Sequence, residues 1–370
     1  MFVGILLLAV VLFFACYYVA CKLCGCVRHF WPKLPRWVNW AGAGLFAALL
    51  VMAFLRARLP GFLASVSVYF MGIFIYLFLC TLLSELVLLV LRLLRKKPQS
   101  LHKAIAILCA TGLALGVSCY GFVQGARLQL TEYDITVSKA MDDPVHIVLL
   151  SDLHLGAEGS EARLPEIVRQ VNALEPDLVC IAGDLFDSDF AAIQDPEQVR
   201  SLLQSLDAAY GVYACLGNHD AGATIGQMVD FLDSANVQLL NDTCTVIDDR
   251  LLLVGRLDGT PIGGIGDLPR RTDLETVLSG GDLTLPVVVM DHNPSHVEDY
   301  SQPVDLVLCG HTHQGQLFPA NIITDLLYAV DYGHYEKDGV QAIVTSGAGT
   351  WGMPMRVGTQ CEIVSITLHS

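Results

Sequence analysis

The amino-terminal third of this sequence contains almost no acidic residues. Residues 1–128 hold one acid, Glu85, beside twelve lysines and arginines, whereas residues 129–370 hold 36 acids and ten basic residues. This change in charge predicts a boundary close to Arg127, with one region in 1–127 and a second domain in 128–370. The acidic domain offers no broad basic surface, so we expect no nucleic-acid partner.

The sequence also lacks a cysteine framework. Its twelve cysteines are scattered, and none forms a Cys-x-x-Cys pair near two histidines at zinc-finger spacing. Cys180, Cys215 and Cys309 lie inside apolar runs, where cysteine behaves as a small buried hydrophobic residue. We therefore expect neither a structural zinc site nor a disulfide scaffold.

Long hydrophobic runs, by contrast, are abundant in residues 1–127. Hydrophobic residues make up 53% of the chain, which is high for a soluble protein. Runs of spanning length predict four transmembrane helices, at 2–19, 38–55, within 62–94 and at 104–123. The lipid bilayer is thus the first expected partner of the chain.

The charges between these runs predict an orientation. Nine basic residues lie in the loops after the first and third runs, against four on the opposite side, including Arg56, Arg58 and Arg127. Because cytoplasmic loops carry the excess of lysine and arginine, the acidic domain is expected outside the cytoplasm, at the plasma membrane of a bacterium.

Residues 128–370 alternate between short apolar runs and amphipathic segments. We expect strands at 128–137, 341–345 and 360–368, and helices at 161–174, 196–208 and 224–234. This alternation predicts an α/β domain in which helices cover a sheet. The glycine-rich stretch 259–266 lacks the Gly-Lys-Ser/Thr ending of a P-loop and is expected to be a loop.

Five apolar runs in this domain each end in a polar signature. The candidate site residues that follow them are Asp152 and His154, Asp184 and Asp187, Asn218 and His219, His292, and His311 and His313. Ligands at the carboxyl ends of several strands are typical of sites in open α/β sheets. Carboxylate, amide and imidazole groups without thiolates favour Mn, Fe or Zn ions. The recurrence predicts an enzyme with two divalent metal ions.

In five motifs the sequence resembles the calcineurin-like metallophosphoesterase superfamily. The motifs are Asp-x-His at 152–154, Gly-Asp-x-x-Asp at 183–187, Gly-Asn-His-Asp at 217–220, His292-Asn-Pro, and Gly-His-x-His at 310–313. They occur in family order across about 145–365. The form Gly-His-Thr-His-Gln-Gly-Gln, with Pro319 beyond it, is similar to the membrane-attached branch of UDP-diacylglucosamine hydrolase-like proteins.

The resemblance implies a fold and a set of roles. The fold would be a four-layer α/β/β/α domain, with two packed mixed sheets flanked by helices. One metal would be held by Asp152, His154, Asp184 and His313, and the second by Asp184, Asn218, His292 and His311. A hydroxide bridging the two ions would attack phosphorus. His219 would act as general acid or stabilise charge, and Asp187 would orient it.

Residues 346–356 offer a candidate substrate rim. Trp351 and Met353 would form an apolar edge, and Arg356 would either contact a substrate phosphate or serve ordinary packing.

Together these features predict a membrane-anchored phosphoesterase that cleaves a phosphodiester, pyrophosphate or phosphomonoester, with lipid-linked substrates among the candidates. Two alternatives remain open at this point. The first is a phosphoprotein phosphatase or a nucleotide phosphodiesterase. The activity of the protein on phosphomonoesters compared with phosphodiesters would distinguish the two. The second is a membrane sensor with a vestigial phosphoesterase fold, which would bind no metal.

Overall fold

The computed structural model describes residues 2–56, 59, 61–94 and 99–370, and these divide into two compact units that meet between residues 122 and 123. Each unit is described by itself. Arg58 and residues 95–97, which entered the charge count above, lie outside the described residues. The boundary at 127/128 stays a prediction.

The first unit consists of long apolar helices. They are α1 (Phe2–Phe30), α2 (Trp37–Phe54), α3 (Gly61–Leu93) and α4 (Ser100–Gly125), of which the last residues belong to the second unit. All four are long and apolar enough to cross a membrane. The four predicted helices are therefore confirmed, although α1 continues about a dozen residues past the predicted end. Within this extension, Lys22 forms a 2.7 Å ion pair with Glu85 of α3.

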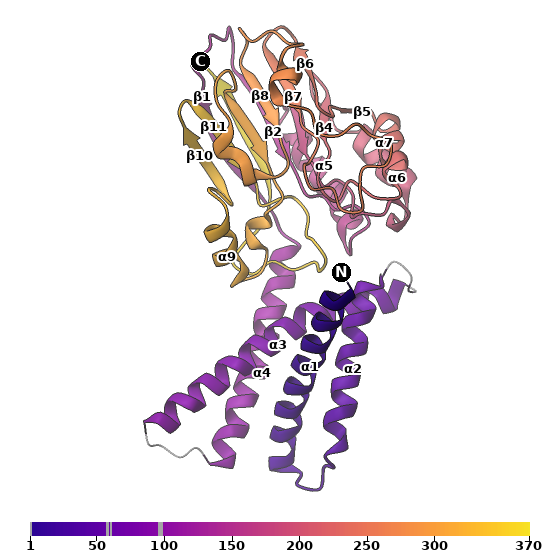
Figure 1. Cartoon of the computed structure of the whole chain (residues 1–370), viewed down its shortest axis with the longest axis vertical. Helices are drawn as coiled ribbons and strands as arrows, with labels where there is room; N and C mark the ends of the chain where they lie inside the picture. Colours follow the sequence, from indigo (N-terminus) through magenta and orange to yellow (C-terminus); the bar gives the residue numbers. More distant parts are fainter. Residues whose placement is uncertain (1, 57–58, 60, 95–98) are drawn as a thin grey trace. The chain divides into compact units, whose positions relative to one another are not determined.

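The second unit contains two six-stranded mixed sheets (Figure 1). The first has the order β1 (Leu128–Thr136), β12 (Cys361–His369), β2 (Val145–Leu150), β3 (Leu178–Ala182), β4 (Val212–Cys215) and β5 (Val237–Leu239). The second has the order β10 (Gly333–Lys337), β11 (Val340–Val344), β9 (Leu306–Cys309), β8 (Val287–Met290), β7 (Leu251–Gly255) and β6 (Thr243–Ile247). The strands β3, β4, β8 and β9, each of which precedes a motif, are buried along their length, and β2 is buried except at His146, as expected for strands covered on both faces.

Three hydrophobic layers hold these sheets together. Between them, alternate residues such as Ile147, Cys180 and Leu308 form a shared core. The outer face of the first sheet packs against α5 (Ser160–Ala173), α6 (Pro196–Gln204) and α7 (Ile225–Ser234) (Figure 1). The outer face of the second sheet is covered in part by α8 (Leu274–Leu278). The expected four-layer fold is thus confirmed.

The differences from expectation are local. The helix α6 ends at Gln204, and Ser205 caps it where the periodicity predicted helix to residue 208. Sequence reasoning also missed β10 and the helix α9 (Ala320–Leu327). The helix α9 has eight residues, which is too short for the spacing of its apolar residues to distinguish a helix from a strand or loop.

The topology brings the motifs together. The pairs β2–β3, β3–β4, β7–β8 and β8–β9 are all parallel, so their carboxyl ends share one edge in each sheet. The two sheets pack face to face through a common core. Five motif segments therefore meet at one end of the sandwich.

Candidate metal centre

The segments that follow β2 and β3 run side by side and fix the first ligands. The amide of Asp152 donates to the carbonyl of Gly183 at 3.0 Å, and that of His154 donates to the carbonyl of Asp184 at 3.0 Å. These bonds continue the parallel pairing past the ends of the strands. Asp152, His154 and Asp184 are held on a shared backbone frame as a result.

Several candidate ligands adopt a left-handed backbone conformation, which residues other than glycine rarely adopt. The φ angles are 57° at Asp152, 46° at His154, 52° at Asp184, 73° at His311 and 49° at His313. Such conformations cost free energy and persist only where the surroundings enforce them. Their concentration at five ligands indicates that the backbone is shaped to direct these side chains inward.

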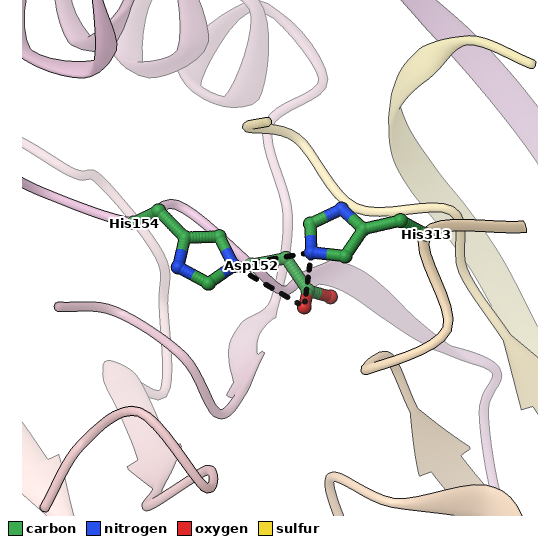
Figure 2. Close-up of side chains that lie close together, drawn as sticks. All are labelled: Asp152, His154 and His313. Atoms are coloured by element: carbon green, nitrogen blue, oxygen red, sulfur yellow. Dashed lines mark hydrogen bonds and ion pairs between the residues drawn. The ribbon is translucent and has the colours of Figure 1, made fainter. Parts of the chain in front are cut away.

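Asp152, His154 and His313 form one cluster (Figure 2). Nε2 of His313 lies 3.2 Å from Oδ1 of Asp152 and 3.1 Å from Nε2 of His154. All three residues are buried. A carboxylate and two imidazoles therefore point their ligand atoms at a common point.

A second cluster lies beside the first. Nε2 of His292 is 3.2 Å from Oδ2 of Asp184, and Nδ1 of His311 is 2.7 Å from Oδ1 of Asn218. Asp184 also faces the first cluster, since its Oδ2 lies 3.8 Å from Nε2 of His154. The structure thus brings all seven predicted ligands together, with Asp184 between the two groups.

The donor set fits divalent cations. Oδ1 of Asp152 and Nε2 of His292 are buried and have no hydrogen-bond partner among the described residues. Buried polar atoms are normally satisfied, and one left unpaired costs free energy. Both atoms face the clusters, so a cation bound there would supply the missing partner for each.

Burial keeps three of the four candidate imidazoles in their ligand form, whereas at His292 burial is outweighed by the carboxylate of Asp184, which raises the pKa well above its ordinary value. Burial lowers the pKa of His154 to about 3 and that of His311 to about 4, because the charged form is poorly solvated. The same cause lowers the pKa of His313 well below its ordinary value. Burial raises the pKa of Asp152 to about 6, which leaves this carboxyl ionised at neutral pH. Neutral imidazoles beside carboxylates are the protonation states that metal binding needs.

Contacts beyond the ligands orient them. Nδ1 of His292 donates to the carbonyl of Ala182 at 2.8 Å, which directs Nε2 toward the clusters. The neighbouring Asp291 binds both guanidinium nitrogens of Arg271, at 3.0 and 2.6 Å, and the hydroxyl of Tyr300. The segment carrying His292 is therefore fixed on both sides. Sequence reasoning missed Arg271 and Tyr300, which belong to no motif.

The structure corrects the proposed substrate contact of Arg356. This side chain is fully buried and donates to the carbonyls of His313, Ser346 and Gly349 at 2.8, 2.6 and 2.7 Å. A guanidinium held in this way is not exposed to substrate. Arg356 instead holds the loop that carries His313. The two residues are too far apart in the sequence for their spacing to predict this contact.

His219 lies at the edge of the site and has two polar neighbours. Its Nδ1 is 2.7 Å from Oγ of Ser188 and 3.9 Å from Oδ1 of Asp187. The Asp187 carboxylate is closer to Nδ1 of His154, at 3.4 Å. Asp187 therefore lies between the two histidines rather than beside His219 alone. Ser188, which directly follows the motif, was not predicted.

Asp220, the last residue of the Gly-Asn-His-Asp motif, ties two loops together. Its buried carboxylate accepts hydrogen bonds from the amides of Leu185, Phe186 and Gly217 at 3.2, 2.8 and 2.9 Å. Gly217 must be glycine, because a β-carbon there would overlap Asp184. The loops that carry Asp184 and Asn218 are thereby locked against each other.

A cavity of about 280 Å³ opens from the ligands to solvent, and its lining includes His219, Ile323 and Trp351. The Trp351 ring lies 6.2 Å from the His219 ring and is 52% exposed, as expected for a residue of the rim. Met353 is buried, so the expectation that it forms part of an apolar edge is wrong.

Comparison with known proteins agrees with this geometry. The calcineurin-like phosphoesterase family matches residues 145–315. A metallophosphoesterase of Helicobacter pylori strain J99 is 32% identical over 69% of this chain and 68% of its own. A Danio rerio protein named as a transmembrane protein with metallophosphoesterase domain is 30% identical over 94% of this chain and 84% of its own.

A more distant relative carries a specific name. The UDP-2,3-diacylglucosamine pyrophosphatase LpxG of Chlamydia trachomatis is 28% identical over 50% of this chain and 70% of its own. Five motifs in order, a double-sheet fold and these matches lead to one conclusion. The chain belongs to the calcineurin-like phosphoesterase family and is a metal-dependent phosphoester hydrolase.

Proposed function

We propose that this protein is a membrane-anchored phosphoesterase with two divalent metal ions and a lipid-linked phosphate ester or pyrophosphate as substrate. One observation carries the proposal: Oδ2 of Asp184 lies 3.8 Å from His154 in one cluster and 3.2 Å from His292 in the other, and Asp184 lines an open cavity together with His219. One ion would be held by Asp152, His154, Asp184 and His313. The other would be held by Asp184, Asn218, His292 and His311.

The chemistry divides between the ions and the chain. When bound, two divalent cations would lower the pKa of a water molecule and neutralise charge on the phosphate. His219 would donate a proton from Nε2 to the leaving oxygen, while Ser188 and Asp187 orient the ring through Nδ1. The cavity would place the scissile phosphate between the ligands and this imidazole.

The membrane assignment is supported by the four apolar helices and by transmembrane relatives. Attachment of the catalytic domain to these helices would concentrate the enzyme near lipid substrates. The excess of basic residues in two of the loops supports a catalytic domain outside the cytoplasm, at the plasma membrane.

The name of the LpxG relative supports a lipid-linked pyrophosphate among the candidate substrates. A phosphoprotein phosphatase or nucleotide phosphodiesterase would use the same ligands, and only substrate preference separates them. A sensor with an inactive domain is disfavoured because every predicted ligand is present and directed into the site.

The test is hydrolysis by the full chain, purified in detergent and loaded with Mn²⁺, of a phosphomonoester, a phosphodiester and a lipid pyrophosphate. We expect metal-dependent turnover that is highest on the lipid substrate and is abolished in Asp184→Asn. Turnover by the variant at the wild-type rate would rule out the proposed centre. Preference for the phosphomonoester would favour the phosphatase.

A further inference from the structure

The helix α9 has the reverse of the usual surface arrangement, because its apolar face is the exposed one. Its large apolar side chains face solvent, with Leu326 and Leu327 exposed by 78% and 75%. Its partly buried positions are Ala320 at its start and the polar residues Asn321 and Thr324. A helix on a soluble surface normally shows the opposite arrangement, with its apolar stripe against the core. This inversion indicates that the outer face of α9 has an apolar partner.

The polar face of α9 fixes the helix next to the metal ligands. The hydroxyl of Thr324 donates to the carboxylate of Asp331 at 2.6 Å, and the hydroxyl of Thr312 donates to the carbonyl of Asp331 at 2.5 Å. Thr312 lies between the ligands His311 and His313 in sequence. The helix is therefore built onto the loop that carries two metal ligands.

The exposed face of α9 continues into the cavity. We define the α9 surface by its exposed apolar side chains, which are Phe318, Ile322, Ile323, Leu326, Leu327 and Trp351. Ile323 and Trp351 also line the cavity that holds His219. A cluster of exposed large apolar side chains beside a site indicates a binding region. The α9 surface adjoins the cavity at Ile323 and Trp351.

The size of the cavity limits what it can hold. At about 280 Å³ it lies at the lower end of small-molecule sites, enough for a phosphate and a small headgroup. A longer apolar portion of the same molecule would have to leave the cavity past Ile323 and Trp351. From there it would lie along α9.

The position of the surface also selects its occupant. A second copy of the chain docked on α9 would cover Ile323 and Trp351 and so obstruct the mouth of the cavity. An amphiphile satisfies both regions at once, since its phosphate reaches the ligands while its hydrocarbon covers exposed leucines.

We propose that the α9 surface is the acyl-chain subsite of the substrate, which is an amphiphile with a phosphate ester next to its hydrocarbon. This inference rests on the proposed phosphoesterase function. It adds that selectivity for long chains comes from α9, outside the metal centre.

The experiment compares two substrates with the same leaving group, methyl 4-nitrophenyl phosphate and dodecyl 4-nitrophenyl phosphate. The protein is the full chain in detergent at one fixed micelle concentration, loaded with Mn²⁺. The variant is Leu326→Gln/Leu327→Gln, and the control is Leu283→Gln, an exposed leucine in the turn before β8. Because micelles affect all proteins alike, the readout is the kcat/KM of each variant relative to wild type.

We expect the double variant to lose about tenfold or more in kcat/KM on the dodecyl substrate, as burial of two leucines against hydrocarbon implies. Its kcat/KM on the methyl substrate should stay within about twofold, and the control should resemble wild type on both. An equal loss on both substrates would show that α9 only supports the metal loop. No loss of kcat/KM on either substrate would show that acyl chains do not bind at α9. Either of these two results would overturn the proposal that α9 is an acyl-chain subsite.

Two further outcomes identify another occupant. Loss on the dodecyl substrate only when it is embedded in lipid nanodiscs would assign α9 to the bilayer instead. Light scattering that shows a wild-type dimer and a monomeric double variant would assign it to a second copy. Failure of the enzyme proposal looks different, since the wild type would then hydrolyse neither substrate in a metal-dependent manner.

Discussion

The guanidinium of Arg356 donates to the carbonyl of His313 at 2.8 Å and lies 3.1 Å from Nδ1 of the same residue. One buried side chain thus holds both the backbone and the ring of a candidate ligand. The backbone of His313 is left-handed, with φ of 49°, and needs such support.

Arg356→Lys and Arg356→Met are therefore expected to weaken metal binding. The contacts that orient ligands are typically worth about 10- to 100-fold in metal affinity. Titration of the metal-free protein with Mn²⁺ would measure the loss, which should be smaller for the lysine variant because it keeps a charged donor. Circular dichroism would establish that both variants fold. Unchanged affinity in a folded methionine variant would contradict the positioning role.

Asp184→Asn is expected to reduce the bound metal and to abolish hydrolysis. Its carboxylate lies between both clusters, and an amide carries no negative charge and offers one oxygen in place of two. Metal content measured by mass spectrometry after dialysis should fall from two ions per chain. Asp230→Asn, on the remote helix α7, serves as the matched control and should retain both ions.

His219→Ala is expected to keep its metal and lose activity. A positioned general acid contributes typically about 10²- to 10⁴-fold, so kcat should fall by that range. The loss should be small for a 4-nitrophenyl ester, because that leaving group departs without a proton, and large for an alkyl ester. Equal losses on the two esters would argue that His219 stabilises charge instead of donating a proton.

Ser188→Ala tests the unpredicted neighbour of His219. Removal of one neutral hydrogen bond costs about 1 kcal/mol, which corresponds to a fivefold lower kcat if it acts in the transition state. Metal content serves as the internal control and should not change. Wild-type kinetics in this variant would leave Asp187 as the orienting residue.

The orientation of the catalytic domain can be tested at the carboxyl terminus. Ser370 is exposed, so Ser370→Cys should react with a membrane-impermeant maleimide in intact cells if the domain lies outside the cytoplasm. The parent chain measures the background from Cys109 and Cys119, which are exposed on α4. Labelling that appears only after the cells are opened would reverse the orientation.

The sequence predicted the candidate ligands because their signal is local. Asp152 and His154, or His311 and His313, stand two residues apart after an apolar strand, and this pattern is visible without a structure. The parallel pairing of the strands then brings the motifs to one edge. This part of the site could be predicted because the ligands within each motif are close in sequence and the strand topology is regular.

The supporting residues could not be predicted in the same way. Arg356 reaches His313 across 43 residues, and Arg271 reaches Asp291 across 20 residues from an irregular loop. Neither contact follows from periodicity or spacing. A substrate-phosphate contact was one of the two roles expected for Arg356, since arginine is almost never fully buried unless its donors are paired. The helix α9 escaped detection for a different reason, because eight residues are too few for the spacing of apolar residues to identify a helix.

The hydrogen bond from His292 to Ala182 crosses from one sheet to the other, and the candidate ligands do the same. Asp152, His154, Asp184 and Asn218 follow strands of the first sheet, whereas His292, His311 and His313 follow strands of the second. Each ion would therefore act as a cross-link between the two halves of the sandwich. Metal supply would govern the folding stability of this domain as well as its turnover, since a ligand that binds only the native state stabilises it by mass action.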